Sequence, residues 1–560
     1  MIRIGNASGF YGDRFDAWRE MLTGGELDVL TGDYLAELTM LILGRDRARD
    51  PSTGYAKTFL RQMEGCLGLA LERGVRIVTN AGGLNPPGLA AALESLAARL
   101  GLSVRIAYVE GDARTRKPTA GFGGGAPGGV YLGGFGIAAA LAAGADVVVT
   151  GRVTDASLVV GPAIAQFGWS RDDLDALAGA TVAGHILECG AQATGGNFSF
   201  FTELPDGGRR PGFPIAEIDA NGTSVITKHP GTGGAVTVET VTAQLLYEIG
   251  APAYLGPDVV TWFDRVRLAE DGPDRVRVTG ARGTPPPPTL KVGVNNLGGF
   301  RNSMTFVLCG LDIEAKAALV RAQLTDSIGG HGLEFVLART DHPDAADTEA
   351  ASALLHVHLR DADPKRAGRA FSAAAVELAL ASYPGCTLTT PPGDGTPYGV
   401  FTAEHVPQSD VEHVVVLPDG QRVTIAPPAT TEVVAARRGS DDEPPSSFGR
   451  PRPAPLGAVV GARSGDKGGD ANLGVWARTD EAYAWLHGWL STARLRDLLP
   501  ETASLDIERY ALPNLRAVNF VLRGLLDEGV AASTRFDPQA KALGELLRAR
   551  IVDIPGELLP

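Results

Sequence analysis

The sequence contains few cysteines, few lysines and few aromatic residues. Its four cysteines are spread over 560 residues without a CxxC pair. This argues against a disulfide framework or a thiolate zinc site and fits a reducing cytoplasm. Only 8 of the 51 basic residues are lysines, so each lysine attracts notice. The formal net charge of −14 argues against nucleic acid as a partner, because nucleic acids bind basic surfaces.

Long apolar runs are also missing. The longest, residues 135–150, is rich in alanine and glycine and is interrupted by Asp146, so it is too short and too polar to cross a membrane. The first residues lack the apolar stretch of a signal peptide. We therefore expect a cytoplasmic protein with no membrane partner.

Glycine, in contrast, is abundant, with 72 residues, and hydrophobic residues make up 44% of the chain, too many for a disordered protein. The first 170 residues alternate short apolar strands with helical patterns. Nearly continuous apolar strands such as 145–150 are typical of a parallel sheet that is buried on both faces. This predicts an α/β fold with a Rossmann-like, doubly wound, mostly parallel sheet.

Composition predicts four segments. Residues 437–455 are polar and rich in proline, which is typical of a linker. The segment before them mixes helical and alternating patterns, and the segment after them has the pattern of a compact α+β domain. We predict a Rossmann-like lobe at 1–215, a second α+β lobe at 216–436, the linker at 437–455 and a small domain at 456–555.

Polar residues and glycines follow the first three expected strands. In open parallel sheets, ligands bind beyond the carboxyl ends of the strands. We therefore predict a ligand site at this edge. A tight strand–helix turn at residues 5–13 and a helix-capping role for Asp33 are the alternatives. The predicted binding residues here are Ser8, Gly9, Asp33, Asn80, Gly82 and Gly83.

Arg152 and Asp155 follow the most apolar expected strand. An arginine can hold a carboxylate or a phosphate through two parallel hydrogen bonds. Asp155 is a candidate general base, or it holds Arg152 in place; a structural Arg–Asp pair is the alternative reading. Nine glycines in residues 121–136 predict a mobile lid over the same edge.

Residues 184–197 combine an acid, a thiol and an amide. Glu188 is a candidate catalytic acid or base, and Gln192 is a candidate ligand contact. Cys189 is either a thiolate nucleophile or a small buried apolar residue. His185 precedes an apolar pair and fits a structural role.

Two of the scarce lysines lie beside glycine turns. Lys228 and His229 precede Thr232 and Gly233. This pattern predicts an anion site in which the basic pair could also polarise a carbonyl; a solvated turn is the alternative.

Lys467 lies in a second glycine loop, residues 463–474, together with Asp470 and Asn472. The loop is either a salt-bridged hairpin or a segment that closes on the main site or on a neighbouring subunit. No histidine cluster or EF-hand spacing supports a metal at Asp466 and Asp470, so none is predicted.

Several long motifs in the same order resemble the acyclic terpene utilisation AtuA family. The resemblance covers about residues 1–440 and 456–555. It implies a ferredoxin-like fold for the C-terminal domain and a role in degrading acyclic terpenes through acyl-CoA thioesters, but it assigns no catalytic residue. The motifs are GNASGFYGD (5–13), NAGGLNPPGL (80–89), DVVVTGRVTDASL (146–158), GHILECGAQATGGNF (184–198), ITKHPGTGGAVTVETV (226–241) and ARSGDKGGDANLGVWAR (462–478).

Two functions stay open. The first is an enzyme that abstracts a proton next to the carbonyl of a small carboxylate or acyl-CoA, as a hydratase or lyase does. Asp155 or Glu188 would be the base, and Arg152 with Lys228 and His229 would hold the oxygen. No cofactor is predicted except coenzyme A as part of the substrate, and we expect a homo-oligomer. The second is a non-catalytic accessory or scaffold subunit of an acyl-CoA carboxylase-type complex. The missing GxGxxG motif disfavours an NAD-dependent dehydrogenase.

Overall fold

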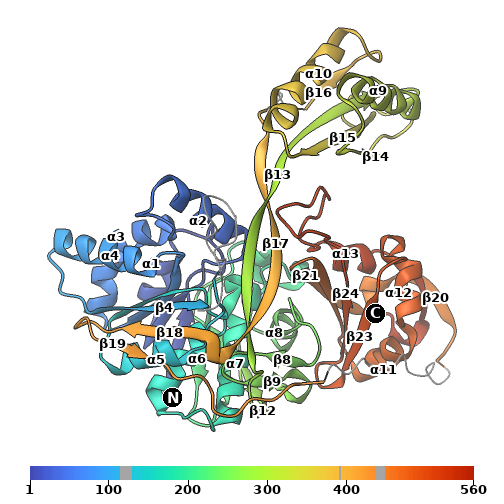
Figure 1. Cartoon of the computed structure of the whole chain (residues 1–560). Helices are drawn as coiled ribbons and strands as arrows, with labels where there is room; N and C mark the ends of the chain where they lie inside the picture. Colours follow the sequence, from blue (N-terminus) through green and yellow to red (C-terminus); the bar gives the residue numbers. More distant parts are fainter. Residues whose placement is uncertain (114–128, 390–392, 436–447) are drawn as a thin grey trace. The chain divides into compact units, whose positions relative to one another are not determined.

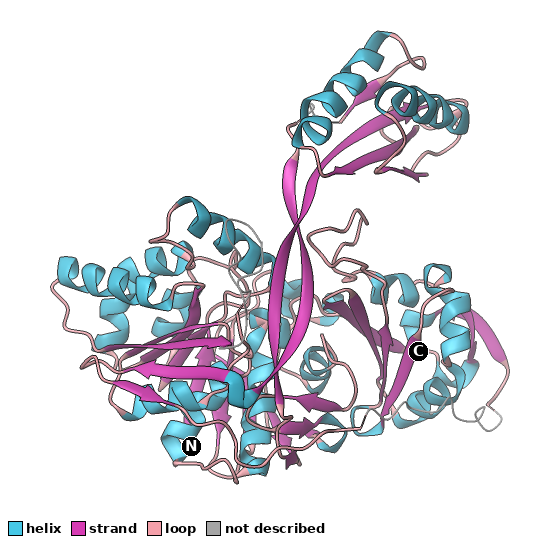
Figure 2. Cartoon of the chain, viewed as in Figure 1, coloured by secondary structure: helices cyan, strands magenta, loops and turns pink. Residues whose placement is uncertain are grey.

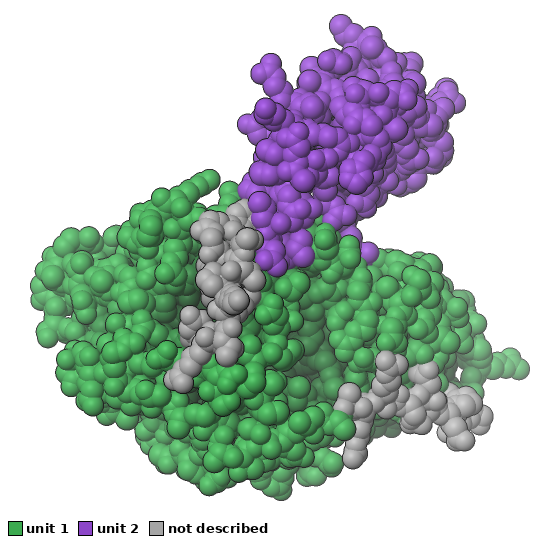
Figure 3. Space-filling view, viewed as in Figure 1, with its two compact units in different colours: residues 1–295, 401–533, 537–560 green, residues 296–400, 534–536 purple. Residues whose placement is uncertain are grey.

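The computed structural model describes residues 1–113, 129–389, 393–435 and 448–560. Two compact units make up the chain, and each is described by itself (Figure 3). The first unit comprises Met1–Asn295, Phe401–Ser533 and Asp537–Pro560, and the second comprises Asn296–Val400 and Thr534–Phe536.

An 11-stranded sheet forms the centre of the first unit (Figure 1). Its five middle strands are parallel, as the apolar strand patterns predict. Their order is β1-β2-β3-β5-β4, whereas the dinucleotide-binding fold has the order 3-2-1-4-5-6, so the Rossmann-like winding is not confirmed. The strands are β1 (Ile2–Asn6), β2 (Val29–Gly32), β3 (Arg76–Gly83), β5 (Val147–Gly151) and β4 (Ile106–Ala113).

Antiparallel strands extend this sheet on both sides. They come from the segment that composition assigned to a second lobe, and they make the sheet mixed, with a parallel centre and antiparallel flanks. One side carries β6 (Pro214–Ile218), β7 (Ser224–Lys228), β11 (Val276–Thr279) and β10 (Arg267–Glu270). The other side carries β18 (Val411–Val416) and β19 (Arg422–Thr424).

Helices cover both faces of the sheet (Figure 2). The helices form two groups, one on each face of the sheet. In β3, Ile77 packs against the first group, and the next residue, Val78, packs against the second. This alternation explains why the strands are apolar throughout. The first group is α1 (Ala17–Gly24), α3 (Lys57–Glu72) and α4 (Pro86–Leu100); the second is α5 (Phe135–Ala142), α6 (Ser157–Phe167) and α7 (Leu174–Glu188).

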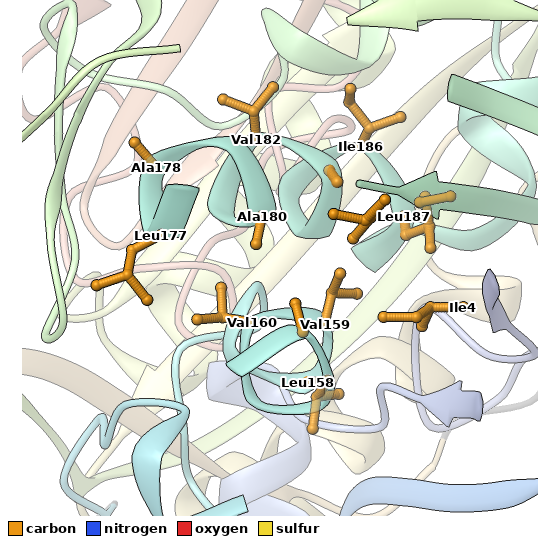
Figure 4. Packing of buried hydrophobic residues seen from close by; sticks show 14 of the residues in the cluster. Ile4, Leu158, Val159, Val160, Leu177, Ala178, Ala180, Val182, Ile186 and Leu187 are labelled. Carbon is orange, nitrogen blue, oxygen red and sulfur yellow. The ribbon is translucent and has the colours of Figure 1, made fainter. Parts of the chain in front are cut away.

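Helix α7 is the most deeply buried of these, because its sequence is apolar or small on every side. Val159 and Val160 of α6 lie between the two helices, and Ile4 of β1 lies near Leu187 (Figure 4). A helix that is apolar all round belongs in the interior. This packing carries the polar end of α7, at Glu188, to the middle of the protein.

The C-terminal domain contains a four-stranded antiparallel sheet and its own apolar core. Part of the predicted linker forms an edge strand, β20 (Pro451–Pro455), which pairs with β25 (Ile551–Pro555). Edge strands tolerate proline, which is why a proline-rich segment can pair here. The other elements are β21 (Val460–Lys467), β22 (Asp470–Ala477), β24 (Ala517–Leu522), β23 (Ile507–Leu512), α11 (Asp480–Trp489), α12 (Thr492–Leu498) and α13 (Leu543–Arg548).

The C-terminal domain packs onto α8 (Val238–Leu245) of the same unit. Trp476 and Leu515 of the domain are buried in the apolar cluster that also contains α7. A capping box at Thr237 and Thr240 begins α8. A small sheet lies in the same unit, formed by β12 (Gly283–Thr284), β9 (Val260–Trp262) and β8 (Ala253–Leu255).

The second unit has a core of its own, in which two helices pack against a five-stranded sheet. Two strands belong to it only in part, because residues 289–295 of β13 (Thr289–Cys309) and residues 401–407 of β17 (Thr396–Pro407) are in the first unit. Its other elements are β14 (Leu333–Ala338), β15 (Ser352–Asp361), β16 (Thr387–Leu388), α9 (Ile313–Ile328) and α10 (Phe371–Glu377). Across all the residues that the structure describes, no helix is both long enough and apolar enough to span a bilayer.

Candidate functional site

The carboxyl ends of β2 and β3 bring two buried polar side chains into contact. Asn80 Nδ2 donates a hydrogen bond of 2.6 Å to Asp33 Oδ1, and Asn80 Oδ1 accepts one of 2.8 Å from the backbone of Tyr34. Burial, followed by the charge of Asp155, raises the pKa of Asp33 well above its usual value. The strand ends therefore meet as predicted, and Asp33 belongs to the same electrostatic cluster as Asp155.

Arg152 and Asp155, beyond the end of β5, form an ion pair of 2.7 Å. The Arg152 side chain is only 4% exposed, whereas Asp155 is 29% exposed. The guanidinium also donates to the carbonyl of Leu35 and lies 4.2 Å from the ring centre of Tyr131. Arg152 is thus fixed from several sides, and the Asp155 carboxylate is the member of the pair that can reach a bound molecule.

Glu188 ends the buried helix α7, and its side chain is only 7% exposed. Its Oε1 lies 3.0 Å from His185 Nδ1, and its Oε2 has no hydrogen-bond partner among the described residues. Burial, then the charges of Asp155 and Glu248, raise the pKa of Glu188 well above its usual value. Burial lowers the pKa of His185 to about 4. A neutral carboxyl group therefore lies beside a neutral imidazole.

Cys189 follows Glu188 directly. Burial and the nearby carboxyl groups of Glu248 and Glu188 raise the pKa of its thiol well above the usual value. A nucleophilic cysteine needs the opposite shift. The thiolate alternative is therefore not supported, and Cys189 is a neutral thiol at this position.

Two residues that sequence reasoning passed over, Lys291 and Tyr131, adjoin Arg152. Lys291 Nζ lies 4.6 Å from the ring centre of Tyr131 and 3.7 Å from Glu37 Oε1. Burial alone would raise the pKa of Glu37, but the positive charges of Lys291 and Arg152 lower it overall. Glu37, at the start of α2 (Glu37–Arg49), is therefore an ionised carboxylate between two cations.

The β21–β22 hairpin of the C-terminal domain also reaches this cluster. Lys467 Nζ donates a hydrogen bond of 2.9 Å to the backbone carbonyl of Glu248. Burial and the charge of Asp466 raise the pKa of Glu248 to about 7. Burial and the charge of Glu37 raise the pKa of Asp466 to about 6. Residues from both ends of the chain thus influence one another's protonation.

Lys228, His229, Thr232 and Gly233 do not join this cluster. Lys228 Nζ makes a 2.9 Å ion pair with Asp274 and donates to the carbonyl of Thr232. His229 Nε2 lies 2.9 Å from the carbonyl of Met21, and Thr232 Oγ1 donates to the carbonyl of His229. Gly233 allows close approach to the backbone of Arg210. Pro230 and Gly231 of the turn are exposed, but the charge of Lys228 is already paired within the protein.

The predicted binding glycines contact the protein's own backbone. A Cβ on Gly9 would lie 2.7 Å from the backbone of Cys189, and one on Gly82 would lie 2.5 Å from the carbonyl of Thr150. Gly83 has a left-handed backbone, with φ of 54°. Ser8 Oγ donates to the carbonyl of Phe10. These residues shape the strand ends through internal packing.

Three further predicted residues hold the C-terminal domain. Gln192 accepts a hydrogen bond from the Arg463 guanidinium. Asp470 forms a 2.6 Å ion pair with Arg523. Asn472 donates to the carbonyl of Leu246 and accepts from the backbone N–H of Glu248. Of the hairpin residues, Lys467 is therefore the one whose charge lies beside the carboxyl cluster.

Sequence reasoning missed Tyr131, Lys291 and Glu248. The scarcity of lysine was a usable signal for Lys291. Tyr131 lies in the predicted lid, of which residues 121–128 fall outside the described residues. No sequence pattern points to Glu248, whose backbone is left-handed, with φ of 57°.

Other kinds of site receive less support from the geometry. Within the described ranges, no group of three or more histidine, cysteine, aspartate or glutamate side chains is arranged to hold a metal ion. A cavity of about 180 Å³ lies at the contact between α8 and the C-terminal domain, lined by residues such as Glu239, Trp476 and Arg478. None of the carboxyl groups of the cluster lines this cavity, so the cavity and the cluster are separate features.

Comparison with known families gives two matches. The family described as acyclic terpene utilisation family protein AtuA matches residues 2–122 and 126–417. The AtuA ferredoxin-like domain matches residues 454–553, which confirms the fold expected for the C-terminal domain. A search of curated proteins found no match to the chain.

Proposed function

Because the chain belongs to the acyclic terpene utilisation AtuA family, we propose that it is an enzyme of acyclic terpene catabolism. Its reaction in this proposal moves a proton next to the carbonyl of a small carboxylate or acyl-CoA thioester, and water is added or removed. The proposal includes a cytoplasmic homo-oligomer, with coenzyme A entering only as part of the substrate.

One observation carries the proposal: two carboxyl groups in contrasting surroundings belong to one cluster. Glu188 is buried without a cationic partner, which raises its pKa well above the usual value, while the partly exposed Asp155 forms an ion pair with Arg152. Environments that separate two carboxyl groups in this way mark the acid and the base of an enzyme.

The reaction follows from these roles. The Asp155 carboxylate removes a proton from the carbon next to the carbonyl, and the C–H electron pair forms the new C=C bond. The C–O bond to the hydroxyl group breaks, and its electron pair takes the proton of Glu188, so that water leaves. Hydration is the same sequence in reverse, with Glu188 as base and Asp155 as acid.

Positive charge beside the acid and base would stabilise the developing oxyanion. Arg152 is immobilised by its hydrogen bonds and by Tyr131, and Lys291 lies on the same aromatic ring. Fixed cations that need no reorganisation are the usual means of stabilising an enolate-like oxygen.

Deuterium exchange in heavy water tests the proton transfer directly. The probes are 3-hydroxy-3-methylbutanoate and its coenzyme A thioester, with exchange followed by NMR and dehydration by absorbance. We expect Asp155→Asn to abolish both exchange and dehydration, because the base is lost. Glu188→Gln should slow dehydration by about 10²–10⁴-fold, and slow it more than exchange, because only the acid is lost.

Glu217→Gln is the matched control. Glu217 is also a buried glutamate, at 6% exposure, but it pairs with Arg3 and Arg275 on the antiparallel side of the sheet. It should react at the wild-type rate. Wild-type rates in both Asp155→Asn and Glu188→Gln would contradict the proposal, as would a wild-type protein that exchanges neither probe; the accessory-subunit hypothesis predicts the latter.

A further inference from the structure

We propose that the C-terminal domain supplies part of the substrate site: Lys467 binds an anionic oxygen group of the substrate together with Lys291. The ligand is a carboxylate or a phosphate, either that of a free acid or that of coenzyme A. This inference rests on the proposed function for the identity of the site, but it concerns binding and can be tested without turnover.

A continuous row of cations and aromatic rings leads from β5 to the hairpin. The Arg152 guanidinium and Lys291 Nζ both lie on the Tyr131 ring, at 4.2 and 4.6 Å from its centre. Lys291 Nζ also lies 5.3 Å from the ring centre of Phe401. A Cβ built on Gly468, at the hairpin tip, would lie 3.6 Å from the same Phe401 ring. Lys467 precedes Gly468 in the chain, so the hairpin brings Lys467 to this end of the row.

Backbone pairing holds Lys291 where it meets Tyr131. The N–H of Tyr131 donates to the carbonyl of Lys291, and Val130 and Val292 form a β-bridge. Lys291 is therefore a fixed part of the first unit, and it does not depend on a flexible loop for its position.

The hairpin is held at the site just as firmly. Its Asn472 bonds the backbone of Leu246 and Glu248, and Asn519 of the neighbouring strand donates to the carbonyl of Gly250. The hairpin glycines make this approach possible: a side chain on Gly474 would collide with Leu246. The domain therefore grips residues 246–250 through their backbone groups.

Charge and exposure indicate what Lys467 does there. The ammonium group of Lys467 has three N–H donors. Among the described residues, one of them is used, in the hydrogen bond to the carbonyl of Glu248. Lys467 is exposed, and Lys291 is 37% exposed, whereas Arg152 is almost fully buried. Removal of water and the positive charge of Lys291 lower the pKa of Lys467. An anion bound to both ammonium groups would relieve this repulsion.

Isothermal titration of the full chain with coenzyme A and, separately, with 3-methylbut-2-enoate tests the inference. We expect Lys467→Met to weaken the binding of one of the two probes at least tenfold without lowering the unfolding temperature. The probe that loses affinity identifies the anion as phosphate or carboxylate. Lys467→Arg, which keeps the charge, should restore most of the affinity.

Lys57→Met is the matched control, since Lys57 is an exposed lysine that pairs with Asp46 on the protein surface. It should bind both probes as the wild type does. Equal affinities in Lys467→Met and wild type would overturn the inference, and so would a wild type that binds neither probe.

The two proposals can fail separately. Weakened binding in Lys467→Met together with a wild type that exchanges no deuterium would leave the anion site standing and reject the reaction. Deuterium exchange by the wild type together with unchanged binding in Lys467→Met would support the reaction and reject the anion site.

Discussion

Two regions of this protein have similar sequence signatures and opposite structural roles. Around residues 152–155 and around residues 228–233, basic side chains lie beside small residues at the end of a strand. Lys228 is paired with one carboxylate, Asp274, and its turn is closed by internal hydrogen bonds. Arg152 instead belongs to a cluster in which several carboxyl groups outnumber the cations. A basic residue beside a turn thus becomes a candidate site where further ionisable groups converge on its ion pair.

Position in the sheet explains the difference. Arg152 follows a parallel strand at the centre, where several strand ends converge on the same point. Lys228 ends an antiparallel strand, whose neighbours run the other way and bring fewer ends together. Convergence of strand ends therefore matters more than the local motif.

The comparison would break if Lys228 proved essential for catalysis. Lys228→Met should lower the free energy of unfolding by about 2 kcal/mol, because a buried ion pair loses one partner while Asp274, at 40% exposure, is partly rehydrated. Urea denaturation measures this loss. Deuterium exchange by the folded variant should match the wild type, and a large loss of exchange in a stably folded variant would restore the sequence-based assignment.

Glu248 tests the other side of this comparison, because burial and neighbouring groups of the Arg152 cluster shift its pKa. Burial raises its pKa to about 7, so the folded protein holds an extra proton between the unfolded value near 4.5 and about 7. Stability from this residue is therefore lost as the pH rises through that window. The charged or titratable groups that influence it, or are influenced by it, are Glu37, His185, Glu188, Cys189, Tyr247, Tyr254, Asp466 and Lys467.

Glu248→Gln should remove this dependence. Relative to wild type, it should gain on the order of 1 kcal/mol at about pH 8 and nothing at about pH 5, since water screens part of the partly exposed carboxylate. Urea titrations at the two pH values measure the difference. The same gain at both values would mean that Glu248 does not titrate in this range.

Substitution of Asp470 should have the smallest effect on stability. It also tests whether ligand binding depends on Lys467 alone or on the whole hairpin. Its ion pair with Arg523 is partly exposed, so Asp470→Asn should cost about 0.5 kcal/mol. Binding of coenzyme A and 3-methylbut-2-enoate should not change, in contrast to Lys467→Met. If Asp470→Asn weakened binding as strongly, the hairpin would act as a whole rather than through Lys467.

The sequence predicted the parts of this protein that depend on local patterns. The apolar strand at Val147–Gly151 is visible in residue order. The rule that strand ends meet also predicted that Asp33, Asn80 and Arg152 lie at one edge of the sheet, and their side chains influence one another there.

The other features depend on contacts between residues that are far apart in the sequence. Nothing local shows that β6 and β7 join β1, because their alternation fits any half-buried strand. The position of Lys291 depends on a bridge to residue 130, which is more than a hundred residues earlier in the chain. Glu248 has a left-handed backbone, and its N–H donates to Asn472, which is more than two hundred residues later in the chain. A sequence read segment by segment does not contain that contact.

The outer position of β18 has a consequence for how the protein is made. Strand β4, residues 106–113, pairs with β5 on one side, and its other side must wait for residues 411–416. During synthesis, an unpaired strand edge is therefore present while about three hundred further residues emerge. Such edges readily pair with other chains. The outer edge of β4 is therefore open to such pairing until β18 is made.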